Sequence, residues 1–149
     1  MKIRYADKTD IQLIAQNNQA MALETEDKRL NDSVIIPGVE AIFNDPKLGF
    51  YLILEISGIQ AGQLMVTPEW SDWRNGLFWW IQSVYVKPEF RNKGVYRALH
   101  EETRRLAKEN GNVVGIRLYV DHDNSGAQAV YKKMGMKESN YVFFEEDWS

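Results

Sequence analysis

Hydrophobic and polar positions follow two different periods along this chain, and each period predicts one type of secondary structure. Runs of apolar residues typical of β-strands lie at residues 2–6, 50–57, 59–67, 77–86, 114–120 and 141–146. Apolar positions three and four residues apart predict helices from Thr9-Asp10 onward, at 33–43, from Gly94 to about Glu109 and at 124–135. We expect Pro37-Gly38 to break the second helix, because proline lacks the N–H that a helix interior uses.

The order of these elements predicts a mixed α/β sheet. Ser57-Gly58 supplies a turn between two strands, and residues 68–76 form a loop that ends in an Asn-Gly turn signal. The strands at 77–86 and 114–120 are separated by a helix, so we expect them to lie parallel. The fold class is therefore α/β, with one mixed, mostly antiparallel sheet and helices on both of its faces.

Composition narrows the class of protein. The chain has 149 residues, of which 44% are hydrophobic and 26% charged, and this predicts a single globular domain over residues 1–149. It has no cysteine and only two histidines, which excludes a cysteine nucleophile and argues against a metal site. The formal charge of −3 argues against nucleic-acid binding. No apolar run approaches the ~20 residues that cross a bilayer, so we expect a cytoplasmic protein without a membrane partner.

The stretch VYVKPEFRNKGVYRAL at 84–99 gathers positive charge in a chain of negative net charge. Lys87, Arg91, Lys93 and Arg97 surround Gly94, where a predicted strand leads into a predicted helix. Free N–H groups at a helix N-terminus attract anions, and glycine lets the backbone approach a ligand closely. The pattern therefore favours a pyrophosphate cradle, with an ordinary strand–helix connection and solvated charges as the alternative. It fits neither a Walker loop nor a dinucleotide fingerprint, which both need more glycines.

The motif RNKGVY within this stretch resembles the acyl-CoA loop of GNAT-type N-acetyltransferases, Arg/Gln-x-x-Gly-x-Gly/Ala. Arg91 and Gly94 match it, while Tyr96 stands where a small residue is usual. A second motif follows about thirty residues later, NSGAQAVYKKMGM, which is similar to the family's Asn-x-x-Ala-x-x-x-Tyr-x-x-x-Gly-Phe. It matches at Asn124, Ala127, Tyr131 and Gly135, with Met136 in place of phenylalanine.

The resemblance implies a fold, a co-substrate and a reaction. The fold would be that of acyl-CoA N-acyltransferases, with six to seven strands of which two central ones splay apart. Acetyl-CoA would donate its acetyl group directly to a primary amine, with the Val84 N–H holding the oxyanion and Tyr131 protonating the sulfur. The resemblance assigns acetyl-CoA binding to Val84, Tyr85, Val86, Arg91, Asn92, Lys93, Gly94, Val95, Tyr96, Arg97, Asn124, Ala127 and Tyr131.

The general base and the acceptor stay open at this point. Several branches of the family carry a catalytic glutamate on the strand before the loop, at positions that here hold Trp80 or Gln82. The base is then either water held by Gln82 or a loop carboxylate, which could be Glu24, Glu26, Glu69 or Asp72. Asp72 and Trp73 also resemble residues of the diamine-acetyltransferase branch, which favours a small cationic amine or polyamine. The residues expected to bind it are Glu24, Glu26, Asp72, Trp73, Trp80 and Gln82.

The acceptor, the presence of turnover, the oligomeric state and the position of His100 are further expectations. The acceptor could instead be a protein N-terminus or a lysine, or the chain could be a CoA-binding sensor of the same fold without turnover. Dimerisation is common in the family, so we expect a homodimer in which the apolar run at 141–146 exchanges or pairs. We expect His100 to face solvent on the helix that follows the cradle.

Overall fold

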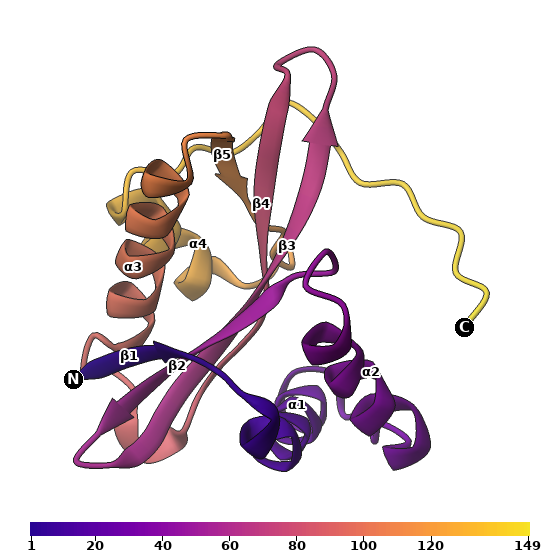
Figure 1. Cartoon of the computed structure of the whole chain (residues 1–149), viewed down its shortest axis with the longest axis vertical. Coiled ribbons are helices and arrows are strands. Elements are labelled where there is room, and N and C mark those ends of the chain that lie inside the picture. The colour runs from indigo at the N-terminus through magenta and orange to yellow at the C-terminus, as the bar shows by residue number, and fades with distance from the viewer. The chain divides into compact units, whose positions relative to one another are not determined.

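The computed structural model describes residues 1–149. The chain forms two compact units, Met1–Leu118 and Tyr119–Ser149. The first unit holds a five-stranded sheet and three α-helices, and Figure 1 shows their course. Its elements are β1 (Lys2–Tyr5), α1 (Ile11–Glu26), α2 (Asp32–Asn44), β2 (Phe50–Ile56), β3 (Ile59–Ser71), β4 (Gly76–Val86), α3 (Val95–Asn110) and β5 (Val113–Arg117). The second unit holds α4 (Ser125–Lys133). No helix combines the length and the apolar character that crossing a membrane requires.

The sheet confirms the predicted fold class and corrects its strand count. Its strands lie in the order β1-β2-β3-β4-β5, the first three junctions being antiparallel and β4 lying parallel to β5. There are five strands and not six to seven, because residues 141–146 form no strand. An alternating apolar run forms a strand only where a neighbouring strand completes its hydrogen bonds. In this segment the side chains are exposed, Phe144 to 91%.

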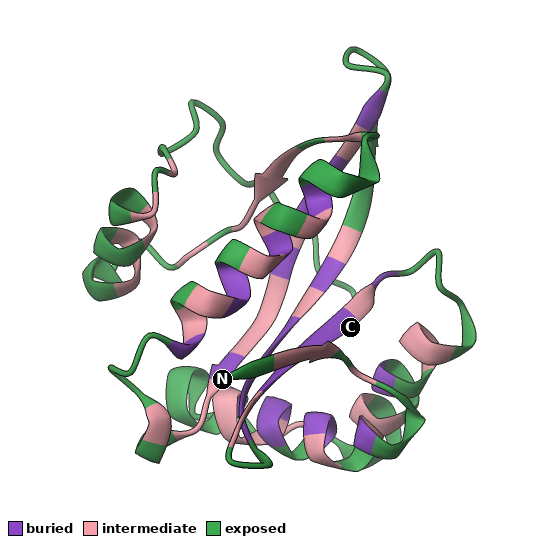
Figure 2. Cartoon of the chain, turned by 60° about the vertical axis from the view of Figure 1, so that its left-hand side comes forward, coloured by how far each residue is buried: buried purple, intermediate pink, exposed green.

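Helices cover both faces of the sheet, as the sequence predicts (Figure 1). Alternate residues of β2 point to opposite faces, so Leu52 and Leu54 pack with α3 while Tyr51 and Ile53 pack with α1 and α2. Figure 2 shows this burial on the central strands and on the inner sides of α1, α2 and α3. The sheet is therefore sandwiched between two separate cores.

Buried amides fix α1 against β3 more firmly than apolar packing alone would. The Asn17 side chain donates to Gln60 Oε1 at 3.0 Å and to Gln63 Oε1 at 2.8 Å. Gln63 in turn donates to Asn18 Oδ1 at 3.1 Å. Since all four side chains are buried, losing one partner would leave a desolvated polar group. The network sets the position of α1 along the central strands.

Two local predictions are wrong. The helix at 33–43 is not broken, since α2 runs continuously through Pro37 from Asp32 to Asn44. Packing of Val39, which is 1% exposed, holds the helix together in spite of the N–H that Pro37 lacks. The predicted loop at 68–76 is instead mostly strand, because residues up to Ser71 continue the β3–β4 hairpin in register.

Candidate functional site

The parallel pairing between β4 and β5 stops halfway along β4. Its last paired positions are Trp80 and Arg117, while β4 continues to Val86. The edge of residues 81–86 that faces away from β3 therefore has no neighbouring strand. This separation of β4 from β5 is the predicted splay of the two central strands. Backbone N–H and C=O groups on such an edge are available to a ligand that lies alongside it.

A β-bulge interrupts β4 within this open stretch. Gln63 pairs with Tyr85, but Met65 pairs with Gln82, so β4 holds one residue more than β3 over the same length. Ser83 absorbs the extra residue with a φ of 50°. A bulge leaves backbone groups outside the regular ladder and redirects them. Val84, the predicted oxyanion donor, lies directly beside it.

The N-terminus of α3 provides the second part of the site. Gly94 caps the helix with a φ of 76°, and a Cβ placed on it would meet no atom within 4 Å. The first backbone hydrogen bond of the helix runs from Ala98 N to Gly94 O at 3.0 Å. The N–H groups of the first turn therefore have no carbonyl partner within the helix, and the helix begins at a glycine whose Cβ position is open.

Three of the four basic side chains of this junction contact other groups of the protein. Arg91 pairs with Glu24 of α1 at 2.7 Å, and Arg97 pairs with Glu101 at 3.0 Å. The Lys93 ammonium lies 5.6 Å from the centre of the Phe90 ring. We conclude that the anion-binding capacity of this junction resides mainly in its backbone, as the glycine suggests.

The tyrosine that departs from the family motif is turned along α3. Its hydroxyl lies 3.0 Å from His100 Nδ1, and the two rings meet edge to face. His100 is 1% exposed, so the expectation that it faces solvent is wrong. Burial and then the nearby Arg104 guanidinium lower the pKa of His100 to about 4, so the ring is neutral near pH 7. The Tyr96 ring thus extends one turn beyond Gly94 and away from the open space.

A polar cluster lies on the α1–α2 face of the sheet, where β4 and β5 separate. A single oxygen of Glu69 accepts from Trp80 Nε1 at 3.0 Å and from Arg117 Nη1 at 2.9 Å. Gln82 donates to Thr67 Oγ1 at 2.6 Å, which leaves its own Oε1 free to accept. Trp80 and Glu69, one of the four candidate carboxylates, are thus in direct contact, whereas Gln82 bonds to Thr67 further along the same face of the sheet.

The other candidate carboxylates lie elsewhere. Asp72 and Trp73 form the tip of the β3–β4 hairpin, where Trp73 is 87% exposed and its N–H donates to Asp72 Oδ1. Asp72 lies five residues beyond Thr67, or about 16 Å along the strand. Glu26 is exposed at the end of α1, and Glu24 is engaged with Arg91.

The second unit carries the remaining predicted residues on and beside α4. Asn124 caps this helix by accepting from Ala127 N at 3.1 Å, as the motif predicts. Burial raises the pKa of Tyr131 from its ordinary value.

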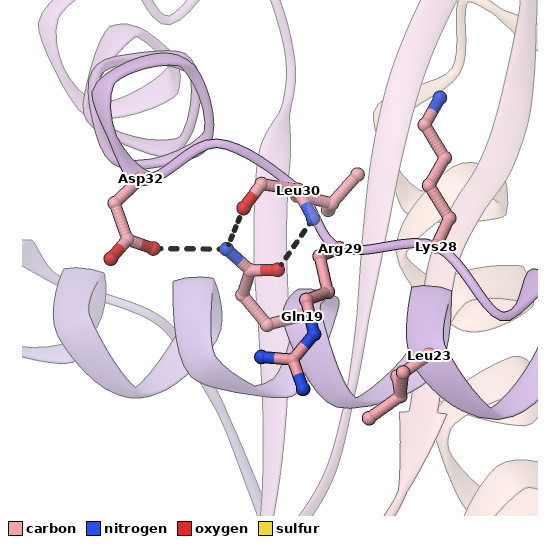
Figure 3. A pocket seen from close by; sticks show the side chains of 6 residues that line it. All are labelled: Gln19, Leu23, Lys28, Arg29, Leu30 and Asp32. Atoms are coloured by element: carbon pink, nitrogen blue, oxygen red, sulfur yellow. Dashed lines mark hydrogen bonds between the residues drawn. The ribbon is translucent and has the colours of Figure 1, made fainter.

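Figure 3 shows a cavity of about 330 Å³ beside the C-terminal half of α1, which the sequence did not indicate. Gln19 bonds both the N–H and the C=O of Leu30 there, and it also donates to Asp32 Oδ1. These bonds hold the loop between α1 and α2 against α1. The cavity is lined by Gln19, Leu23, Lys28, Arg29, Leu30 and Asp32.

Comparison with known proteins agrees with this geometry. The family model "Acetyltransferase (GNAT) family" matches residues 14–136. A solved structure described as a possible acetyltransferase from Clostridium difficile 630 is 40% identical, with a TM-score of 0.92 over 98% of this chain and 96% of that one. A predicted acetyltransferase with acetyl-CoA from Clostridium acetobutylicum is 20% identical, with a TM-score of 0.80 over 97% and 95% of the two chains, and this likeness concerns the fold.

A curated relative supports the same grouping over a shorter stretch. An uncharacterized N-acetyltransferase of Methanocaldococcus jannaschii is 34% identical over 62 residues. That match covers 42% of this chain and 27% of the relative, so this chain aligns with about a quarter of that protein.

Proposed function

The chain belongs to the acetyltransferase (GNAT) family, whose enzymes use acetyl-CoA, and we propose that it transfers an acetyl group from acetyl-CoA to the primary amine of a small cationic molecule. The observation that carries the proposal is the junction between β4 and α3. An open strand edge with a bulge at Ser83 leads into a helix that begins at Gly94, where the Cβ position is unobstructed. A pantetheine arm can add to the open edge as a strand would, while the helix N-terminus receives the pyrophosphate.

The proposed reaction is direct attack of the amine on the thioester. The neutral amine nitrogen forms a bond to the carbonyl carbon, and the carbonyl oxygen becomes an anion that the Val84 N–H stabilises. The C–S bond then breaks, the thiolate takes a proton from Tyr131, and the amine proton passes to a base. Tyr131 is proposed as the acid because a tyrosine phenol is protonated near neutral pH and can donate its proton to the thiolate.

Glu69 is the acceptor-side carboxylate that the geometry favours. It bonds to Trp80, one of the two positions where relatives with a strand glutamate place their base, and its second oxygen is directed to no other bond. At the other position, Gln82 Oε1 can hold a water molecule, which is the alternative base. Trp80 offers a ring face that suits a cationic amine. Asp72 and Trp73 can reach only the outer part of a long acceptor.

Calorimetric titration with acetyl-CoA, followed by turnover assays with a panel of amines, tests this function. The panel contains a diamine, a polyamine, an uncharged primary amine, a peptide with a free N-terminus and a lysine peptide. The proposal predicts micromolar binding and turnover of the small cationic amines. Binding without turnover of any amine would instead establish a CoA-binding sensor, and preference for a peptide would establish a protein acetyltransferase. No binding of acetyl-CoA would refute the function altogether.

We also propose that the chain is one acetyltransferase domain that works in the cytoplasm as a homodimer. The family match extends through both units, which supports a single functional domain. Tyr141, Phe143 and Phe144 are each at least 67% exposed, which is unusual for neighbouring aromatic residues and suits pairing with a second copy. Light scattering on the purified protein should give the mass of two chains, and replacing Phe143 and Phe144 by serine should give monomers.

A further inference from the structure

Arg91, the arginine of the acyl-CoA loop motif, makes a set of contacts that leaves its guanidinium little freedom. Its Nη2 bonds to Glu24 Oε2 at 2.7 Å, and its Nε donates to the Val86 carbonyl oxygen at 2.9 Å. The guanidinium carbon lies 5.7 Å from the centre of the Tyr85 ring. The Tyr85 hydroxyl lies 3.5 Å from the second oxygen of Glu24. One side chain thus joins the loop to the end of β4 and to the last turns of α1.

The Val86 carbonyl that Arg91 holds belongs to the open edge of β4. The N–H of Lys87 shares its peptide plane and donates to Ala61 O of β3 at 2.9 Å. In a trans peptide the C=O and the N–H point in opposite directions, so this carbonyl points away from β3. Arg91 therefore occupies the Val86 carbonyl, which is the last hydrogen-bonding group of the β4 edge along which a pantetheine arm would lie.

The position of Glu24 is set by a buried anchor. Asn17, seven residues earlier on α1 and hence on the same helix face, is fixed by the buried side chains of Gln60 and Gln63. This anchor delivers the Glu24 carboxylate to Arg91 on a rigid helix. An ion pair whose side chains are both about two-fifths exposed adds little to stability, so the value of this pair lies in the geometry that it imposes.

We propose that Glu24 is a positioning residue for acetyl-CoA, and this inference rests on the proposed function. Glu24 holds the Arg91 guanidinium between α1 and the Val86 carbonyl, and Arg91 in turn holds the loop of residues 87–94 in the shape that presents the α3 N-terminus. Arg91 acts through the backbone that it fixes and does not serve as a ligand of the pyrophosphate. Its guanidinium is bound to the carboxylate when the cofactor arrives.

The effect of Glu24→Gln separates this role from direct binding. If Arg91 were a pyrophosphate ligand, removing a competing carboxylate would free it and would also remove a negative charge, so acetyl-CoA would bind more tightly. In a positioning role the same substitution loosens the loop, and acetyl-CoA binds more weakly, by on the order of fivefold to tenfold. Arg91→Lys keeps the charge but cannot hold a carboxylate and a carbonyl at once, so it should weaken binding to a similar degree.

The experiment is calorimetric titration of acetyl-CoA into wild type, Glu24→Gln, Arg91→Lys and the double variant. Glu101→Gln is the matched control, since it removes the same charge from the ion pair with Arg97 in the first turns of α3. We expect the two single variants and the double variant to share one loss of affinity, while Glu101→Gln stays within about twofold of wild type. Unchanged or tighter binding by Glu24→Gln would overturn the inference, as would an equal loss in Glu101→Gln. A wild type that does not bind acetyl-CoA would refute the proposed function itself, whatever the variants do.

Discussion

Gly94→Ala tests whether the cofactor binds at the N-terminus of α3. In the free protein a Cβ at this position meets no atom within 4 Å, so the new methyl group creates no clash. Its only cost to the fold is the φ of 76°, which an L-residue adopts with about 1–2 kcal/mol of strain. Reduced freedom of the unfolded chain offsets part of this cost. The free energy of unfolding should therefore fall by only about 1 kcal/mol, which lowers the melting temperature by about 2–4 °C in a chain of this size.

The loss of binding should be much larger than the loss of stability. The methyl group occupies the space through which a pyrophosphate oxygen reaches the N–H groups of the first turn. Each hydrogen bond from such a donor to a charged oxygen contributes about 1.5–3 kcal/mol, so the loss of two raises the dissociation constant at least ~100-fold. Valine at the same position should abolish binding, because its branched side chain fills more of this space.

Gly111 offers a control at the other end of the same helix. It also has a φ of 76°, and a Cβ placed on it also meets no atom within 4 Å. Gly111→Ala should therefore lose as much thermal stability as Gly94→Ala while acetyl-CoA affinity stays at the wild-type value. Thermal denaturation and calorimetric titration of both variants give the comparison. Equal acetyl-CoA affinities in the two variants would refute the cradle, since backbone strain alone would then explain the result.

Three further outcomes are expected. Tyr131→Phe should lower kcat by ~100-fold with little change in acetyl-CoA affinity, as the loss of a positioned acid does, and pre-steady-state assays would check it. Glu69→Gln should lower kcat/KM for a small cationic amine by at least ~10-fold, whereas Asp72→Asn at the hairpin tip should change it by less than about threefold. The unfolded state protonates His100 near pH 6.5 but the folded state only near pH 4, so stability is full above pH 6.5 and falls toward pH 4. Urea denaturation should show a loss of about 2 kcal/mol between pH 7 and pH 5, which His100→Gln abolishes and His122→Gln retains.

The sequence predicted most of the fold because its strands and helices each carry their own local signal. The continuous apolar run of β2 and the long apolar run of β4 identify central strands, and the helix between 77–86 and 114–120 requires the parallel pairing of β4 with β5. The apolar run at 141–146 has the same local signal without a partner strand in the chain, so the prediction fails there. The pattern of apolar residues shows that a segment can form a strand, but it forms one only where a neighbouring strand pairs with it.

The contacts of the basic residues were beyond sequence reasoning. Arg91 lies 67 positions from Glu24, and only the anchoring of α1 on β3 brings the two together. His100 is followed directly by Glu101 and Glu102, which suggests an exposed face of the helix, yet it is buried on α3 against Tyr96. A spacing of four residues between Tyr96 and His100 was the available signal, since such pairs meet on a helix surface.

Binding by backbone and recognition by side chains place different demands on this sequence. Acetyl-CoA needs an open strand edge and an unobstructed helix N-terminus. The only residue type that these two features require is the glycine at position 94. Tyr96 can therefore depart from the family motif without harm, because its ring turns toward His100 and its N–H remains in place. On the other face of the sheet we expect the acceptor to meet side chains, and there the proposed acceptor positions Trp80 and Gln82 carry no carboxylate. Since Glu69 reaches Trp80 from the neighbouring strand, a carboxylate can return to nearly the same place from a different position in the sequence. A search for the acceptor-binding residues of related chains should accordingly compare positions in the sheet, across both β3 and β4, and not positions in one motif.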